Sequence, residues 1–76
     1  MAKQVYREKS QPIEVQIQIA RAIVAQNENG MAYQTDLIAR LERRNMDSGS
    51  AHRVLALYRE GLAGALARLA ALEAVQ

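Results

Sequence analysis

Hydrophobic residues recur at alternating spacings of four and three residues along most of this chain. In the first half the repeat runs without a slip through Ile13, Ile17, Ala20, Val24, Asn27, Met31, Gln34, Ile38 and Leu41. In the second half it runs through Ala51, Leu55, Tyr58, Leu62, Ala65, Leu69 and Leu72. This spacing keeps one stripe of side chains on a single helix face. It is the pattern of a coiled-coil seam and predicts two long helices packed along their length. We call these two sets of residues the seam.

The segment between the two stripes combines a helix stop with a helix start. Asn45 tolerates the left-handed backbone conformation in which many helices end. Asp47 or Ser48 can accept hydrogen bonds from the free N–H groups that open the next helix. A connection this short makes the two helices antiparallel neighbours.

Pro12, the only proline, marks the start of the first helix, because its fixed φ suits the first helical position. The residues before it are polar and show no helical repeat. The fold class predicted from these signals is all-α. It is an antiparallel hairpin of two long helices, at about 12–45 and 48–75, which form a hairpin domain at 12–76 behind a flexible arm at 1–11.

The stretch around Asn29–Gly30 looks locally like a turn. A bend there would start a three-helix fold, but the seam beyond it would then have no reason to keep its phase. Since the phase does continue, the sequence favours one helix that is weakened in the middle, where Gly30 costs about 1 kcal/mol relative to Ala.

Folding the two stripes about the turn sets an expected register. Its cross-helix pairs are Leu41 with Leu55, Ile38 with Tyr58 and Val24 with Leu72. In this register Ile13 and Ile17 project beyond the end of the second helix and need another surface to cover them. Asn27 and Gln34 interrupt the apolar seam, and they either pair to fix the register or oligomeric state, or face solvent.

Each helix also carries a second apolar stripe that a lone hairpin leaves exposed. It contains Ile19, Ile23, Tyr33 and Leu37 in the first helix, and Val54, Leu57, Gly61, Gly64, Ala71 and Val75 in the second. Helices with such wide apolar faces belong in bundles. We therefore expect a homodimer that forms a four-helix bundle; the alternative is that the arm or a third helix covers the stripe. The predicted interface residues are Ile13, Ile17, Ile19, Ile23, Tyr33, Leu37, Leu57, Gly61 and Gly64.

Composition narrows the function classes. The chain has 76 residues, no Cys, one His and a formal net charge of +2. His52 has no second His or Cys with which to bind a metal, and the scattered glycines form no phosphate-binding loop. We expect neither an enzyme nor a metal or cofactor site. No apolar run approaches the ~20 residues that span a bilayer, and no signal segment is evident, so we expect a cytoplasmic protein.

Basic residues gather near the turn and support a second function hypothesis. The set is Arg40, Arg43, Arg44, His52 and Arg53. With a break at Gly30, residues 35–41 would form a short first helix and residues 48–58 a recognition helix of a small DNA-binding helix-turn-helix regulator. Against this, the second helix stays apolar far beyond the length of a recognition helix.

The residues around the turn also resemble a known group of proteins. The pattern consists of Gln34, the run Leu37-Ile38-Ala39-Arg40-Leu41-Glu42, then Asn45, Asp47, Ser48, Ala51 and Leu55. It is similar to small helical-hairpin proteins of rhizobia and related α-proteobacteria, over about residues 17–72. Asn45 stands where that group has Gly, and Ser48 where it has Thr. The resemblance implies a helical hairpin and brings no activity with it. The expected function is a non-catalytic interaction or scaffold protein acting through helix–helix contacts, with a homodimer as the expected assembly and another protein as a further partner.

Overall fold

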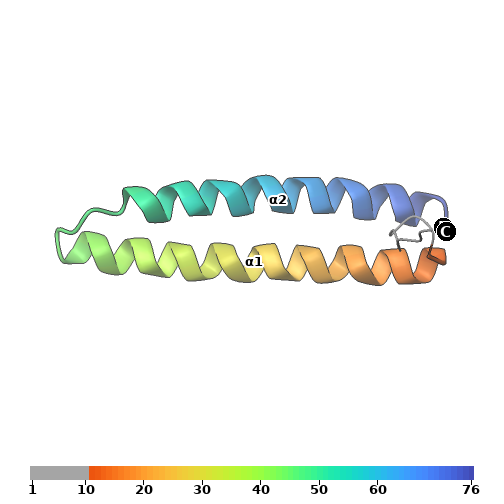
Figure 1. The fold of residues 1–76 in the computed structure, drawn as a ribbon, viewed down its shortest axis with the longest axis horizontal. Helices are drawn as coiled ribbons and strands as arrows, with labels where there is room; N and C mark the ends of the chain where they lie inside the picture. The colour runs from red at the N-terminus through yellow and green to blue at the C-terminus, as the bar shows by residue number, and fades with distance from the viewer. Residues whose placement is uncertain (1–10) are drawn as a thin grey trace, which may run out of the picture.

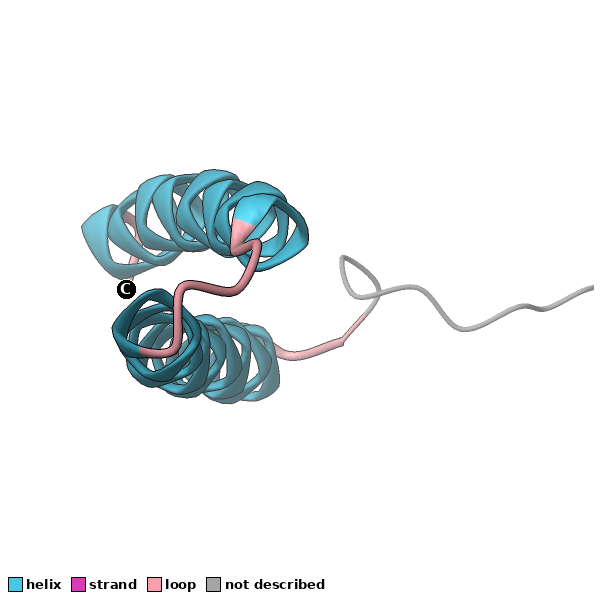
Figure 2. Ribbon diagram, turned by 90° about the vertical axis from the view of Figure 1, so that its left-hand side faces the viewer, coloured by secondary structure: helices cyan, strands magenta, loops and turns pink. Residues whose placement is uncertain are grey.

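The chain folds into two antiparallel helices that lie side by side. The computed structural model describes residues 11–76, with α1 at Ile13–Arg43 and α2 at Gly49–Ala74 (Figure 1). Seen end-on, these residues form a single pair of helices, and none of them is in a strand (Figure 2). The all-α hairpin is confirmed. Apart from Gln11, the predicted arm lies outside the described residues.

The N-terminus of α1 is built on Pro12. The Pro12 carbonyl oxygen accepts hydrogen bonds from the N–H groups of Val15 (3.0 Å) and Gln16 (3.1 Å). Glu14 lies in the first turn, where its negative charge interacts favourably with the positive end of the helix dipole. The helix therefore starts immediately after the proline, one residue later than expected.

α1 continues without a break through Asn29–Gly30, which confirms the continuous helix. The missing side chain at Gly30 makes room for the ring of Tyr58. A Cβ added to Gly30 would lie 2.6 Å from Cδ1 of that ring and closer still to Cε1 and Cζ. Gly61 of α2 faces Asn27 in the same way, because an added Cβ would lie 3.1 Å from the Asn27 Cγ. The two glycines allow close helix contact in the middle of the hairpin.

The end of α1 satisfies its last carbonyl groups within the turn. Asn45 has a φ of 57°, in the left-handed region. Its N–H donates to the Glu42 carbonyl (3.1 Å), and the Met46 N–H donates to the Leu41 carbonyl (2.9 Å). These two bonds make a Schellman motif. The helix stop predicted at Asn45 is confirmed.

At the start of α2, Asp47 precedes the N-cap residue Ser48 and satisfies one of the free N–H groups of the helix. Its Oδ1 accepts a hydrogen bond from the N–H of Gly49 (2.9 Å). The Ser48 hydroxyl donates instead to the Glu42 carboxylate of α1 (3.0 Å). Of the two residues considered for the cap, Asp47 binds the backbone and Ser48 links the helices.

The seam is the contact between α1 and α2. All the buried hydrophobic residues of the described chain are seam positions: Ile17, Ala20, Ile38, Ala51, Leu55, Ala65 and Leu72. One cluster joins Ile17 and Ala20 to Leu72, and a second joins Ile38 to Ala51 and Leu55. Between the clusters, the half-buried Asn27 donates its amide hydrogen to the Ile23 carbonyl of its own helix (2.9 Å). Asn27 therefore satisfies its amide group locally.

The register of the hairpin differs from the expected one. Ile38 clusters with Ala51 and Leu55 rather than with Tyr58, and Tyr58 lies over Gly30. The partner of Tyr58 has thus moved by about two helical turns. The expectation that Ile13 and Ile17 project beyond α2 is wrong, because both pack in the cluster that contains Leu72.

The path of the turn explains the shift. Residues 44–48 belong to neither helix, and the connection runs back alongside the end of α1 before α2 begins (Figure 1). A non-helical residue advances up to about 3.3–3.6 Å, whereas a helical residue rises about 1.5 Å. The connection therefore carries the start of α2 back along α1 farther than the same number of helical residues would, in the direction of the observed shift. The shift is close to one seven-residue repeat, so the buried clusters still join seam residues of both helices.

Candidate interaction surface

The two edges of the hairpin differ in chemistry. Consecutive residues of a helix are about 100° apart around its axis. The residues that directly follow a seam residue therefore lie on one side of the contact between the helices, and the residues that directly precede a seam residue lie on the other side. On the first edge Arg21 of α1 forms an ion pair with Glu73 of α2 (3.2 Å). Glu42 of α1 contacts Ser48 and His52 on the same edge. We call this the polar edge.

The opposite side is apolar, and most of its residues are exposed. We call it the open face; it comprises Ile19, Ile23, Tyr33, Leu37, Val54, Leu57, Gly61, Gly64, Ala71 and Val75. Leu57 is 66% exposed, Tyr33 59% and Val75 72%. Ile19 and Ile23 are each 37% exposed. Large apolar side chains are therefore uncovered along both helices of the described hairpin.

The predicted interface residues divide into two sets. Ile19, Ile23, Tyr33, Leu57 and Gly64 are exposed on the open face, as the stripe predicted. Leu37 is half-buried beside the Ile38 cluster but borders the same face. Gly61 is half-buried against Asn27, Ile13 packs beside the Leu72 cluster, and Ile17 is 3% exposed. The hairpin itself therefore covers Ile17, which is not part of the open face.

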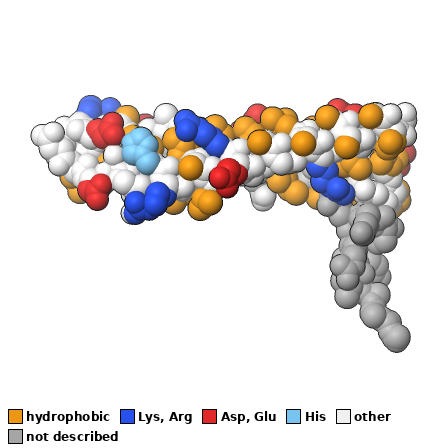
Figure 3. Space-filling view, turned by 90° about the horizontal axis from the view of Figure 1, so that it is seen from above, with side chains coloured by type: hydrophobic (Ala, Val, Ile, Leu, Met, Phe, Trp, Pro, Cys, Tyr) orange, Lys and Arg blue, Asp and Glu red, His pale blue; other side chains and the backbone are white. Residues whose placement is uncertain are grey.

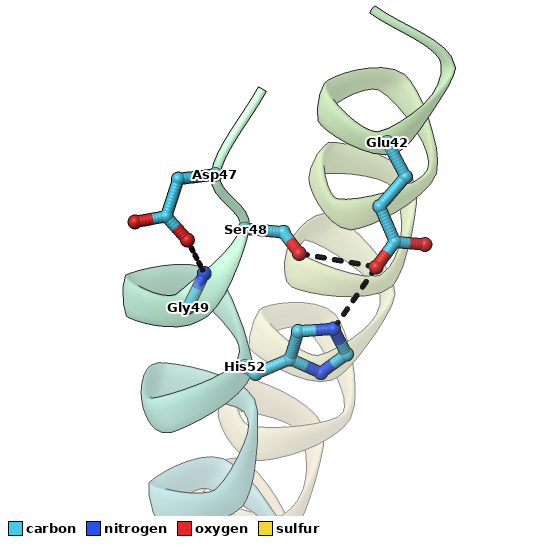
Figure 4. A network of polar contacts seen from close by, with 5 residues as sticks. All are labelled: Glu42, Asp47, Ser48, Gly49 and His52. Atoms are coloured by element: carbon cyan, nitrogen blue, oxygen red, sulfur yellow. Dashed lines mark hydrogen bonds and ion pairs between the residues drawn. The ribbon is translucent and has the colours of Figure 1, made fainter. Parts of the chain in front are cut away.

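A polar cluster at the turn was not predicted from the sequence. Glu42 Oε2 accepts hydrogen bonds from the Ser48 hydroxyl (3.0 Å) and from His52 Nε2 (3.3 Å), as Figure 4 shows. The bonds from His52 and then Ser48 lower the pKa of Glu42 below its ordinary value. The Ser48 hydroxyl points at the carboxylate rather than at the imidazole, so the three groups lack the order of a nucleophile–base relay. Their arrangement ties the turn to α1.

The basic residues near the turn are interleaved with carboxylates. Arg40 forms an ion pair with Asp36 (3.1 Å), and His52 contacts Glu42. Arg53 donates to the Ser50 hydroxyl (3.0 Å). Figure 3 shows charged side chains of both signs gathered toward the turn end of the α2 side. This is a mixed surface rather than a single basic patch.

The helix-turn-helix interpretation required a short first helix after a break at Gly30. That helix is not formed, because α1 is unbroken from Ile13 to Arg43. Arg43 and Arg44 are exposed beside the turn. The chain has ten basic and eight acidic residues, of which three basic and one acidic lie in residues 1–10. Residues 11–76 therefore contain seven arginines and seven acidic residues. The described hairpin is therefore formally neutral.

Nowhere in the described hairpin do three or more metal-ligating side chains (His, Asp or Glu) come together. Neither α1 nor α2 has an apolar stretch of the length and hydropathy that a bilayer-spanning helix needs. Comparisons of the chain with models of known protein families, with curated proteins and with solved structures find no match.

Proposed function

We propose that this chain is a non-catalytic helix–helix interaction protein that pairs through its open face with a second copy of itself to form a four-helix bundle. The observation that carries the proposal is the exposure of large apolar groups along both helices, with Leu57 at 66% and Tyr33 at 59%. A pair of helices has one interior surface, whereas stable domains are built from at least two packed layers. Stacking two hairpins supplies the second layer.

The size of the open face supports a second copy as the partner. The 26 residues of α2 extend over about 39 Å at 1.5 Å per residue. Two helices of ~10 Å diameter packed side by side are about 20 Å wide. The face therefore measures roughly 800 Å², which matches the ~800 Å² that each partner buries in a stable interface of standard size.

The charges support an uncharged apolar partner. The open face is apolar, and the two arginines beside it are engaged locally: Arg40 with Asp36, and Arg68 with the Gln16 side chain (3.4 Å). With the described hairpin formally neutral, an acidic or nucleic-acid partner finds no concentrated positive charge to bind. The same apolar face on another copy has the required chemistry.

Analytical ultracentrifugation at tens of micromolar tests the proposal. The expected mass is twice the 8.4 kDa of one chain. Leu57→Ala should raise the dissociation constant at least tenfold, because burying a Leu contributes ~1.5–3 kcal/mol and a factor of ten corresponds to ~1.4 kcal/mol. Leu66→Ala is the matched control, since Leu66 is 47% exposed but lies on the polar edge. A wild-type monomer under these conditions would refute the proposal.

A further inference from the structure

Two hairpins that stack through one face have two symmetric arrangements. If the two-fold axis runs across the helices, the turns lie at opposite ends and each helix packs on its own copy. If the axis runs along the helices, the turns lie at the same end and α1 packs on α2 of the partner. In both cases the contact is isologous, so each pair of residues occurs twice.

α2 carries a projecting residue and an opening on one line of its surface. Leu57 is 66% exposed, and no atom lies within 4 Å of the position that a Cβ on Gly64 would take. The two positions are seven residues apart, which is two helical turns and therefore the same face. Suppose that the partner's α2 packs antiparallel on α2 and that the two-fold axis crosses α2 between residues 60 and 61. Leu57 then lies over the partner's Gly64, and by symmetry the partner's Leu57 lies over Gly64.

The same axis has an independent consequence for α1. Because Gly30 faces Tyr58 and Asn27 faces Gly61, residues 27 and 28 of α1 lie level with this axis. Because the two-fold axis crosses α1 at this level, the partner's α1 packs antiparallel on α1 with Ile23 beside the partner's Tyr33. It also sets Ile19 beside the partner's Leu37. The position of the axis was set by α2 alone, and the same axis also pairs the large apolar residues of α1 with those of the partner's α1.

Uniform spacing favours this arrangement over the other. With the axis along the helices, Tyr33 would meet the partner's Leu57 toward the turn, and Ile23 would meet the partner's Gly64 toward the termini. Because the side chains at the contact set the distance between helices, the pair would diverge along its length. With the axis across the helices, the two copies of α2 pack closely throughout and the two copies of α1 are farther apart throughout.

We infer that the hairpins pack head to tail, with α2 on the partner's α2 and Leu57 in the space above the partner's Gly64. The arrangement rests on the dimer proposed above and specifies its geometry. It places the turn of each hairpin beside the start of α1 and the end of α2 of the other copy.

Spin labels at one distant position measure the arrangement. The chain has no Cys, so Ala74→Cys supplies a single exposed labelling site near the end of α2. Residue 74 lies 13 to 14 residues from the axis, so head-to-tail packing separates the two copies by about 40 Å at 1.5 Å per residue. In the other arrangement the two positions are level, and the backbones lie about 15 Å apart across the bundle.

The outcomes of pulsed electron paramagnetic resonance and of a mass measurement are distinct. A dimer with a distance near 40 Å supports the inference. A dimer with a distance near that of level helices overturns the head-to-tail arrangement and leaves the proposed function standing. A monomeric mass overturns the proposed function, and with it the arrangement.

Gly64→Leu gives a second test that does not depend on labels. The new side chain meets no atom of its own hairpin within 4 Å of the Cβ position, and Leu favours a helix more than Gly does. The hairpin should keep its helical signal, while the dissociation constant of the dimer rises at least tenfold. Ala67→Leu, at an exposed position on the outer side of α2, should leave it unchanged. A Gly64→Leu dimer as tight as the wild type would overturn the inference.

Discussion

Replacing Gly30 by Ala sets two physical effects against each other. Within a helix, Ala is more stable than Gly by about 1 kcal/mol, because Gly loses more backbone freedom on folding. On propensity alone, Gly30→Ala should stabilise α1. The ring of Tyr58, however, occupies the space into which the new methyl group would project.

The steric cost is set by the distance to that ring. The added Cβ would lie 2.6 Å from Tyr58 Cδ1 and closer to two further ring atoms. Carbon atoms in optimal contact are about 3.5–4.0 Å apart, so the ring or the helices must move by roughly 1 Å. Forcing an extra methyl group into a packed site costs typically 1–3 kcal/mol. The cost exceeds the gain over most of this range, and we predict a net loss of up to about 2 kcal/mol.

Urea denaturation followed by circular dichroism measures this balance at one protein concentration for every variant. Asn29→Ala is the matched control, because Asn29 is exposed on the same helix and its replacement changes propensity without meeting Tyr58. In a Tyr58→Leu background, where the ring is absent, Gly30→Ala should become stabilising. A gain of about 1 kcal/mol for Gly30→Ala in the wild-type chain would refute the contact between Gly30 and Tyr58, and with it the register.

Three further predictions test the turn and its surface. Asn45→Ala should lower the free energy of unfolding by about 1–2 kcal/mol in urea, because φ is 57° there, whereas Asn45→Gly should not. By NMR titration the pKa of Glu42 should lie below its ordinary value and rise toward that value in His52→Ala. Because folding lowers this pKa, the contribution of Glu42 to stability is present above the ordinary pKa and is lost as the pH falls through the folded pKa. Glu42→Gln should therefore flatten this part of the acid unfolding curve. Fluorescence anisotropy with mixed-sequence duplex DNA at low salt should give no tight complex; binding that weakens steeply with added salt would instead favour the basic turn as the functional site.

The seam, the turn and the open face could be predicted because each depends on local spacing. The four-three repeat fixes which residues share a helix face, whatever lies opposite them. Asn45 at a helix end has a conformational preference of its own. Sequence could not show that Asp47 rather than Ser48 accepts the backbone hydrogen bond at the start of α2, because the Ser48 hydroxyl donates to Glu42 across the turn.

The register could not be predicted, because a seven-residue repeat looks the same after a shift of one repeat. The buried clusters join seam residues in both registers, so the path of residues 44–48 is what distinguishes them. Two other features depend on this register and were missed with it. Gly30 was interpreted as a weak point of α1, yet it makes room for Tyr58. The contact between Glu42 and His52 likewise exists only once the two helices are aligned.

The melting temperature of the wild-type chain as a function of its concentration tests the central claim, that a second copy covers the open face. For a dimer, a hundredfold increase in concentration contributes about 2.7 kcal/mol to stability. For a folded unit of about 150 residues, each kcal/mol shifts the melting temperature by ~2–4 °C. The account predicts a rise of roughly 5–10 °C over that range, and a melting temperature that does not change with concentration would contradict it.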